Sequence, residues 1–263
     1  MNRSDVLQMT PESAMPHDRP VGRVRPDCMP AEAVVLNRAV LAEAGVFGFA
    51  PLDIRSRSFI LLRSQILHRF HRPGGRILAV TSTQPENGKT FVTANLAAAL
   101  SLIHPTVLVD LDLRRPRLAG RFGITPSSGI DDYLDGTAAW PSTGTRIAGA
   151  DLTIHGARES RADSASLLAA PRLAVFLAAI RNHPAQPICI VDTPPVLVLD
   201  DIMLIARNVD AVLMIVEEGR TRGSDIAQAL RILSPTPVIG SVLNKSLTGR
   251  SVRNMDGYYH DKG

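Results

Sequence analysis

The sequence predicts an α/β fold in which a mostly parallel sheet has helices on both faces. From residue 76 onward, short apolar runs alternate with longer segments whose apolar residues recur at helical spacing. Such alternation is typical of parallel sheets built from strand–helix–strand units. The first apolar run also leads into a loop that ends in Gly88-Lys89-Thr90, directly before a helical pattern. Both observations favour a sheet whose strand ends carry a ligand site.

The expected strands are short apolar runs bounded by glycine, proline or polar residues. They lie at residues 76–82, 106–110, 152–154, 187–192, 211–216 and 238–243. The expected helices have apolar residues three or four positions apart and lie at residues 54–71, 89–102, 164–182, 202–208 and 224–233. Two shorter helices are expected where glycines stop the pattern, one within residues 31–44 and one between Gly129 and Gly136.

Composition divides the chain into three parts. Residues 1–50 form an N-terminal extension rich in Pro, Arg, Asp and Ser up to about residue 30, and we expect it to be largely disordered apart from the short helix. Residues 51–249 form the main domain. Residues 250–263 form a polar, tyrosine-bearing tail that we expect to be flexible.

Composition also excludes several classes of protein. With 263 residues, 45% of them hydrophobic, the chain can form one large core. The formal charge of +4 does not require nucleic acid, and 4% aromatic residues leave little for base stacking, so we expect no nucleic-acid partner. Cys28 and Cys189 form neither a disulfide framework nor a zinc site, which fits a reducing cytoplasm. No apolar run approaches the ~20 residues that span a bilayer, so work at a membrane requires a partner.

The segment after the first strand fits a phosphate-binding loop and the start of its helix. Its expected nucleotide-binding residues are Pro85, Glu86, Asn87, Gly88, Lys89, Thr90 and Phe91. Backbone N–H groups face the anion, Lys89 supplies charge to the β- and γ-phosphates, and Thr90 offers a hydroxyl to Mg²⁺. The loop is imperfect, because Thr83 stands where a glycine is usual, five residues before Gly88. The sequence therefore predicts a P-loop NTPase-like domain.

Two further strands end in carboxylates. One leads into Asp110 and Asp112, and the other leads into Asp192. Because the carboxyl ends of parallel strands line the ligand crevice, we expect these carboxylates at the same edge as Lys89. The candidate metal ligands are Thr90, Asp112 and Asp192.

The spacing of these motifs resembles the bacterial tyrosine kinase family, the P-loop kinases of capsule and exopolysaccharide systems. That family has a phosphate loop, then three apolar residues before D-x-D-x-R, then three apolar residues before D-T-P-P. The matching segments here are residues 84–90, 107–114 and 188–195, within a likeness over about residues 53–246. The D-x-D-x-R element is the specific one, because general P-loop ATPases lack it. Residues 35–63 are similar to the subgroup associated with exosortase-linked exopolysaccharide clusters.

The resemblance implies an ATP- and Mg²⁺-dependent protein tyrosine autokinase in exopolysaccharide or capsule biosynthesis and export. Lys89 would offset charge on the transferred phosphoryl group. Asp110 would orient and deprotonate the acceptor tyrosine, and Asp112 would support the metal or that base. Arg114 would stabilise the transition state, or else form a salt bridge that fixes Asp112. Asp192 would hold Mg²⁺ through water.

Two further site elements lie near the C-terminus. Asn244 follows the last strand and is expected to meet the adenine base, with a simple strand-end turn as the alternative. Tyr258 and Tyr259 are the expected phosphoacceptors, because they lie on the tail and Tyr133 is the only other tyrosine. The alternative is that these two tyrosines are incidental.

The chain departs from the family pattern in three places. The family loop usually reads P-G-E-G-K, so Glu86 replaces a glycine; Asn87 is expected to compensate, because asparagine tolerates left-handed backbone. The family's E-x-x-R-x-x-R element for ring assembly falls on Arg57, Ile60 and Arg63, of which only the last matches. The terminal tyrosine cluster is reduced to two residues.

The resemblance also implies a homo-oligomer and an activating partner, the cytoplasmic segment of a membrane polysaccharide chain-length or co-polymerase protein. The chain would then be cytoplasmic and recruited to the inner face of the plasma membrane. Two other functions remain open. A partitioning or positioning P-loop ATPase is disfavoured, because Gln84 stands where that family has an extra lysine. A non-catalytic nucleotide-binding regulator of polysaccharide polymerisation is favoured by the altered loop and the few tyrosines.

Overall fold

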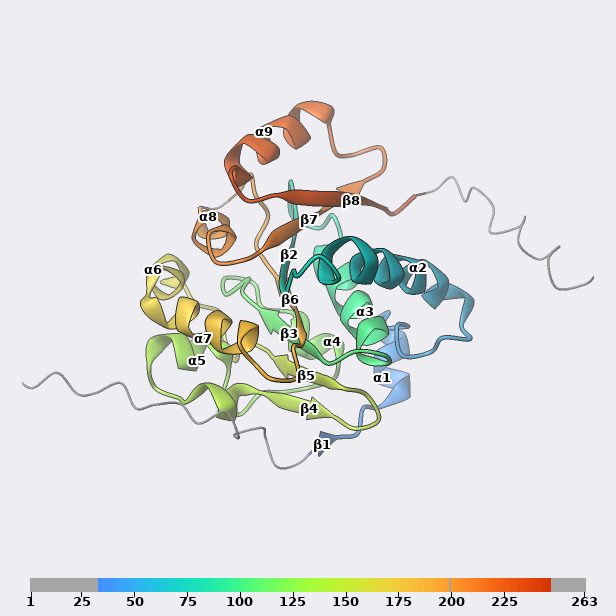
Figure 1. Cartoon of the computed structure of the whole chain (residues 1–263), viewed down its shortest axis with the longest axis vertical. Helices are drawn as coiled ribbons and strands as arrows, with labels where there is room; N and C mark the ends of the chain where they lie inside the picture. Colours follow the sequence, from blue (N-terminus) through green and yellow to red (C-terminus); the bar gives the residue numbers. More distant parts are fainter. Residues whose placement is uncertain (1–32, 199, 247–263) are drawn as a thin grey trace, which may run out of the picture.

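The computed structural model describes residues 33–198 and 200–246 of the chain (Figure 1). These residues form an eight-stranded sheet in which every neighbouring pair is parallel except β4 and β5. In spatial order the strands are β1 Ala33–Val34, β4 Thr145–Ile147, β5 Leu152–His155, β3 Thr106–Asp110, β6 Ile188–Asp192, β2 Ile77–Ser82, β7 Ala211–Glu217 and β8 Val238–Asn244. The prediction of a mostly parallel sheet is confirmed.

Helices cover both faces of the sheet, as predicted (Figure 1). One face carries α1 Arg38–Glu43, α2 Arg57–Ile66, α3 Lys89–Ser101 and α4 Leu118–Arg121. The other face carries α5 Ile130–Asp135, α6 Ser164–Ala169, α7 Pro171–Arg181, α8 Asp201–Ala206 and α9 Gly223–Leu233. Shorter turns are η1 Ile54–Ser56, η2 Leu67–His71 and η3 Trp140–Thr143.

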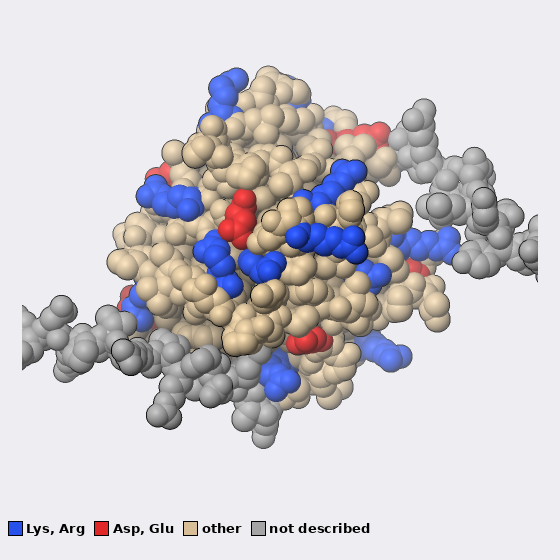
Figure 2. Space-filling view, in the orientation of Figure 1, with Lys and Arg blue, Asp and Glu red and all other residues tan. Residues whose placement is uncertain are grey.

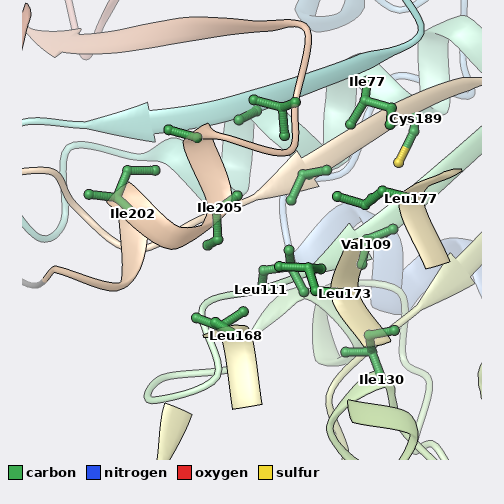
Figure 3. Close-up of a cluster of buried hydrophobic side chains, with 14 of the residues drawn as sticks. Ile77, Val109, Leu111, Ile130, Leu168, Leu173, Leu177, Cys189, Ile202 and Ile205 are labelled. Carbon is green, nitrogen blue, oxygen red and sulfur yellow. The ribbon is translucent and has the colours of Figure 1, made fainter. Parts of the chain in front are cut away.

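The sheet separates two hydrophobic clusters. Alternate residues of each central strand point to opposite faces, so Ile77 belongs to one cluster and Leu78 to the other. Figure 3 shows the first cluster, in which Leu173 and Leu177 of α7 lie close to Val109 of β3. A strand buried on both sides is held rigidly, and this rigidity fixes the strand ends that carry the polar residues.

The N-terminal part of the described chain packs on the domain, which differs from the expected extension. β1 pairs with β4, and the helix expected within residues 31–44 begins only at Arg38, because the Asn37 side chain accepts the N–H of Ala39. Asn95 of α3 then accepts the N–H groups of Phe47 and Gly48 at 2.7 and 3.0 Å. Residues 1–32 and the tail at 250–263 lie outside the described residues, so the predictions made for them stay predictions.

Two other predictions differ in detail. The single helix expected at residues 164–182 is two helices, because Ala170 precedes Pro171 and takes an extended conformation with ψ 146°. α4, η3 and β4 occupy a region that the sequence left irregular, since elements of three or four residues show no periodicity. None of the helices in residues 33–198 and 200–246 is long and apolar enough to cross a membrane.

Candidate active site

The predicted site residues meet at one edge of the sheet because β3, β6 and β2 are neighbours. In the strand register, Asp110 lies opposite Asp192, and Asp192 lies opposite Val80. The loop that follows β2 therefore starts beside both carboxylates.

The phosphate loop bends through two left-handed residues. Gly88 has φ +90°, a left-handed conformation that favours glycine, and a Cβ there would meet the side chain of Asn244. The second left-handed residue is Glu86, with φ +65°. The expectation that Asn87 would supply the missing left-handed backbone is wrong, since the residue that replaces the family's glycine takes that conformation itself.

Asn87 compensates through its side chain instead. Its Oδ1 accepts the N–H of Gln84 at 3.0 Å, and its Nδ2 donates to Glu217 Oε2 at 2.8 Å. Nζ of Lys245 donates to the other Glu217 oxygen at 3.2 Å and to the carbonyl of Glu86 at 2.7 Å. The bond from Asn87, followed by that from Lys245, lowers the pKa of Glu217. Glu217 therefore braces the loop, a role that no motif in the sequence indicated.

Asn244 also holds the loop. Its Nδ2 donates to the carbonyl of Asn87 at 2.9 Å, and the side chain lines the pocket. It is thus more than a strand-end turn, while its expected contact with a base stays a prediction.

Lys89 lies against the second carboxylate of the D-x-D-x-R element. Its Nζ donates to Asp112 Oδ2 at 2.6 Å, and both side chains are largely buried. Burial opposes the charge on Lys89, but Asp192, Asp112 and Asp110 outweigh burial and raise the pKa of its ammonium group. Lys89 is therefore a charged donor at the base of the pocket.

Asp192 is held by two threonines of α3. Oγ1 of Thr90 donates to one carboxylate oxygen at 2.6 Å, and Oγ1 of Thr93 donates to the other at 3.1 Å. Thr93 was missed by sequence reasoning, although it lies on the same helix face close to one turn after Thr90. Burial raises the pKa of Asp192 despite the opposing effect of Lys89.

Asp110 is buried at the turn that follows β3. It is fully buried and accepts backbone N–H groups from Asp112, Arg117 and Leu118 at 3.0–3.2 Å. Burial, followed by the charge of Asp192, raises the pKa of Asp110 well above its ordinary value. Asp110 thus fixes the turn after β3, and Asp112 is the carboxylate of this pair that lines the pocket; the expected role of Asp110 toward the acceptor tyrosine stays a prediction.

Arg114 pairs with Asp201, at 3.3 Å between Nε and Oδ2, rather than with Asp112. Ser164 donates to the same Asp201 oxygen at 2.7 Å. The expected alternative, a salt bridge from Arg114 that fixes Asp112, is therefore not formed, because Lys89 holds that carboxylate.

These groups surround one pocket of about 700 Å³. It is lined by the phosphate loop, the start of α3, the D-x-D-x-R loop, α4 and the end of β8, including Pro85, Glu86, Gly88, Lys89, Thr90, Phe91, Asp112, Arg114 and Asn244. Asp192 lies just beneath, behind Thr90. Tyr258 and Tyr259 lie outside the described residues.

The donor set suits Mg²⁺ bound together with a nucleotide. Within residues 33–198 and 200–246, no three His, Cys, Asp or Glu side chains converge to hold a metal by themselves. Mg²⁺ usually takes one or two carboxylates and completes its shell with water and substrate phosphates. Thr90 and Asp192 offer hard oxygen donors, and the raised pKa of Asp192 reports a buried carboxylate in need of positive charge.

A strand, a phosphate loop with lysine and threonine, and strand-end carboxylates define a P-loop nucleotide-binding protein. Sequence comparison shows which P-loop proteins the chain is similar to. The chain is 33% identical over 177 residues to the succinoglycan biosynthesis transport protein ExoP of Rhizobium meliloti, covering 65% of this chain and 22% of ExoP. It is 27% identical over 214 residues to the tyrosine-protein kinase wzc of Salmonella typhimurium, covering 80% of this chain and 29% of wzc.

A solved structure agrees. The crystal structure of the VpsO kinase domain matches with a TM-score of 0.67 and 26% identity, covering 73% of this chain and 97% of that domain. No protein-family model matches the chain. The chain is thus similar in sequence to bacterial tyrosine-protein kinases and in fold to a solved kinase domain, and it spans less than a third of the length of ExoP and wzc.

Proposed function

We propose that the chain is an ATP- and Mg²⁺-dependent protein tyrosine kinase that phosphorylates Tyr258 and Tyr259 of its own tail and acts in exopolysaccharide or capsule biosynthesis and export. The observation that carries this proposal is the contact between Lys89 and Asp112. It joins the phosphate loop to the element that distinguishes these kinases, inside one pocket.

The chain's own residues provide the steps. Lys89 leaves Asp112 and turns to the β- and γ-phosphates, which are held by the backbone N–H groups of residues 86–90. Asp112, then free, orients the tyrosine hydroxyl and takes its proton while the phosphoryl group passes from ATP to the tyrosine oxygen and ADP leaves. Positioning and electrostatics supply most of the rate in such transfers. Arg114 lines the same pocket and is a second cation for the developing charge.

Thr90 and Asp192 are the proposed Mg²⁺ ligands, with Asp112 beside them. Bound there, Mg²⁺ would neutralise charge on the β- and γ-phosphates. Asn244 is proposed to meet the base.

The partner is proposed by analogy with the relatives. We propose that the cytoplasmic segment of a membrane polysaccharide co-polymerase activates the chain and brings it to the inner face of the plasma membrane, where it forms a homo-oligomer. Arg63, the one match to the ring-assembly element, donates to the carbonyl of Ala99 within its own chain at 3.1 Å.

The test is phosphosite mapping by mass spectrometry on protein made in its native host. Wild type should carry phosphate on Tyr258 or Tyr259, and Lys89→Ala should lose it while circular dichroism shows the same fold. Tyr258→Phe/Tyr259→Phe should lose the label and keep ATP binding. Absence of phosphotyrosine in a wild-type protein that binds ATP would favour the regulator, and ATP hydrolysis without phosphotyrosine would favour the partitioning ATPase.

A further inference from the structure

One wall of the pocket carries an excess of positive charge. The loop after β3 and the short helix α4 contribute side chains that line the same pocket as the phosphate loop. These side chains are Arg114, Arg115, Arg117 and Arg121. We call the last three, Arg115, Arg117 and Arg121, the arginine wall.

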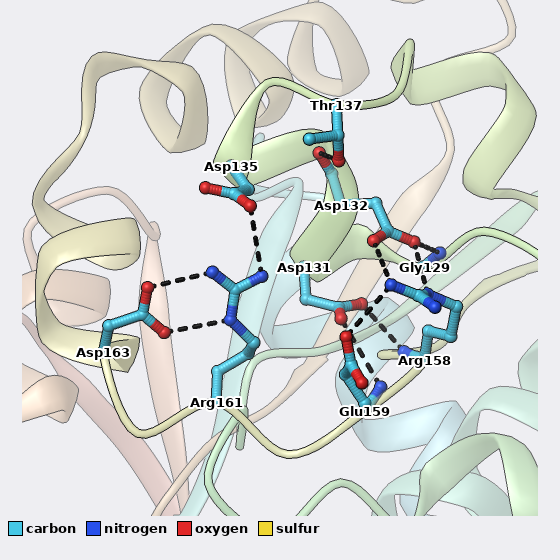
Figure 4. A network of polar contacts seen from close by, with 9 residues as sticks. All are labelled: Gly129, Asp131, Asp132, Asp135, Thr137, Arg158, Glu159, Arg161 and Asp163. Carbon is cyan, nitrogen blue, oxygen red and sulfur yellow. Dashed lines mark hydrogen bonds and ion pairs between the residues drawn. The ribbon is translucent and has the colours of Figure 1, made fainter.

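Other arginines near this loop are neutralised by carboxylates. Figure 4 shows Arg161 held by Asp163 and Asp135, at 2.9 and 3.4 Å, and Arg158 held by Asp132 at 2.9 Å. Figure 2 likewise shows Asp and Glu side chains among the Lys and Arg side chains of the surface. The arginines on the neighbouring segment at residues 158–161 are therefore neutralised by carboxylates of their own.

The arginine wall has no such partners. In the described part of the chain, Arg115, Arg117 and Arg121 form no ion pair, and the side chains of Arg115 and Arg117 form no hydrogen bond. Arg121 donates to the carbonyl of Ala44 at 2.7 Å, and its Nε is buried without a partner. Burial, together with the nearby charge of Arg117, lowers the pKa of Arg121. The wall therefore lacks the negative charge that a ligand would supply.

The backbone beneath the wall is fixed. Asp110 accepts the N–H groups of Arg117 and Leu118, as described above. The hydroxyl of Ser160 donates to the carbonyl of Arg114 at 2.6 Å, and the N–H of Arg161 donates to the carbonyl of Leu113 at 2.8 Å. A fixed backbone with unpaired guanidinium groups is preorganised, so less entropy is lost when an anion binds.

The position of the wall points to the acceptor rather than to the nucleotide. In the proposed function, Lys89 and the backbone N–H groups of the phosphate loop already bind the triphosphate. Arg115 and Arg117 come from the loop that carries Asp112, which in the proposed function orients the acceptor tyrosine. A side chain next to that tyrosine would lie beside the wall.

We infer that the arginine wall binds the acceptor segment and selects tyrosines that have Asp or Glu two residues away. The inference rests on the proposed function. In an extended peptide, side chains two residues apart point to the same face, so the carboxylate enters the pocket on the same side as the tyrosine. Guanidinium groups bind carboxylates through paired, charge-assisted hydrogen bonds.

The chain's own tail has this pattern. Asp256 stands two residues before Tyr258, and Asp261 stands two residues after Tyr259. Each tyrosine thus has a carboxylate at the required spacing, one on each side of the pair.

The test uses the full chain carrying Tyr258→Phe/Tyr259→Phe, so that only added peptide is labelled. Two peptides are compared as acceptors: residues 254–263, and the same peptide with Asp256→Asn and Asp261→Asn. The ratio of kcat/KM for the charged peptide over the neutral one should be about three to ten, the size expected for two exposed ion pairs. In an added Arg115→Gln/Arg117→Gln background the ratio should fall towards one.

A matched control removes the same charge elsewhere. Arg146 on β4 and Arg231 on α9 are exposed and do not line the pocket, so Arg146→Gln/Arg231→Gln should keep the ratio. A ratio near one with the wall intact would overturn the inference. So would a ratio that persists in Arg115→Gln/Arg117→Gln while the KM for ATP rises, because the wall would then serve the nucleotide.

A binding measurement separates this inference from the proposed function. Fluorescence anisotropy of the labelled peptides, with a non-hydrolysable ATP analogue present, needs no phosphoryl transfer. If the charged peptide binds preferentially but no phosphotyrosine forms, the inference about the arginine wall holds and the proposed kinase function is wrong. If both peptides are phosphorylated with equal kcat/KM, the proposed kinase function holds and the inference about the arginine wall is wrong.

Discussion

Nζ of Lys89 lies 2.6 Å from Oδ2 of Asp112, so the lysine of the phosphate loop forms a buried ion pair with the D-x-D-x-R element. In the proposed function, nucleotide binding exchanges this ion pair for contacts with phosphate. Asp112 therefore competes with the ligand that Lys89 is proposed to bind.

Substitution of Asp112 should have opposite effects on nucleotide affinity and on the rate of tyrosine phosphorylation. Asp112→Asn should bind Mg²⁺-free ADP about threefold to tenfold more tightly, because Lys89 is no longer neutralised. Its kcat for tyrosine phosphorylation should fall by about 10²–10⁴, the usual contribution of a positioned proton acceptor. Isothermal titration calorimetry in EDTA measures the Kd for ADP, and a peptide phosphorylation assay measures kcat. Weaker ADP binding with an unchanged kcat would contradict both roles.

Asp192 should make the nucleotide-free protein less stable as pH rises. Its folded pKa is raised by burial, so its contribution is present below the unfolded pKa and is lost as pH rises through the folded pKa. The unfolding free energy of wild type minus that of Asp192→Asn should therefore decrease as pH rises above about 4, the ordinary pKa of an aspartate in the unfolded chain. Urea unfolding at several pH values measures this difference.

Magnesium and ATP should restore the lost stability in wild type but not in Asp192→Asn, since the variant lacks the proposed carboxylate ligand. A difference in unfolding free energy that stays flat or increases with pH would show that burial does not raise the pKa of Asp192.

Restoring glycine at position 86 should relax the phosphate loop. A left-handed non-glycine residue costs about 1–2 kcal/mol of backbone strain, which glycine removes. Glycine also gives the unfolded chain more conformational freedom, and this offsets part of the gain. Glu86→Gly should therefore add up to about 1 kcal/mol of stability. Because Glu86 also lines the pocket with a negative charge, ATP should bind about threefold more tightly.

Gln186 offers a matched control, since it has φ +47° and does not line the pocket. Gln186→Gly should relieve the same backbone strain, lose the hydrogen bond that Arg76 donates to the Gln186 side chain at 2.9 Å, and leave the Kd for ATP unchanged. Thermal unfolding and ATP titration of both variants test the assignment, and equal ATP affinities in wild type and Glu86→Gly would argue against an electrostatic role for Glu86.

The N-terminal segment should detach when Gly48 gains a side chain. A Cβ on Gly48 would lie 2.3 Å from the backbone oxygen of Asn95, which sits inside α3 and cannot move away. Gly48→Ala should cost about 1–3 kcal/mol, as other overpacked sites do. Gly120→Ala, where nothing lies within 4 Å, should be close to neutral. Chemical denaturation compares them, and equal stabilities would mean that this segment packs loosely.

The elements that sequence predicted well are those with a strong local signal. β3 and α3 follow from a buried run and a long helical pattern, and the strand-end rule brought Lys89 and Asp192 to one edge before the strand order was known. Sequence could not show which contacts each site residue makes. The D-x-D-x-R spacing did not indicate that Asp110 accepts the N–H groups of Asp112, Arg117 and Leu118.

The phosphate loop shows the same limit. Propensity pointed to Asn87 as the left-handed residue, yet Glu86 takes that conformation. The brace from Glu217 joins residues 130 positions apart, so it exists only because β7 lies beside β2. No local pattern could have indicated it.

The end of β8 has a mechanical consequence. Asn244 and Lys245 close the last strand and also grip the carbonyls of Asn87 and Glu86. The last strand and the phosphate loop are therefore mechanically coupled. A force applied at the end of β8 would be transmitted first to the backbone of residues 86 and 87.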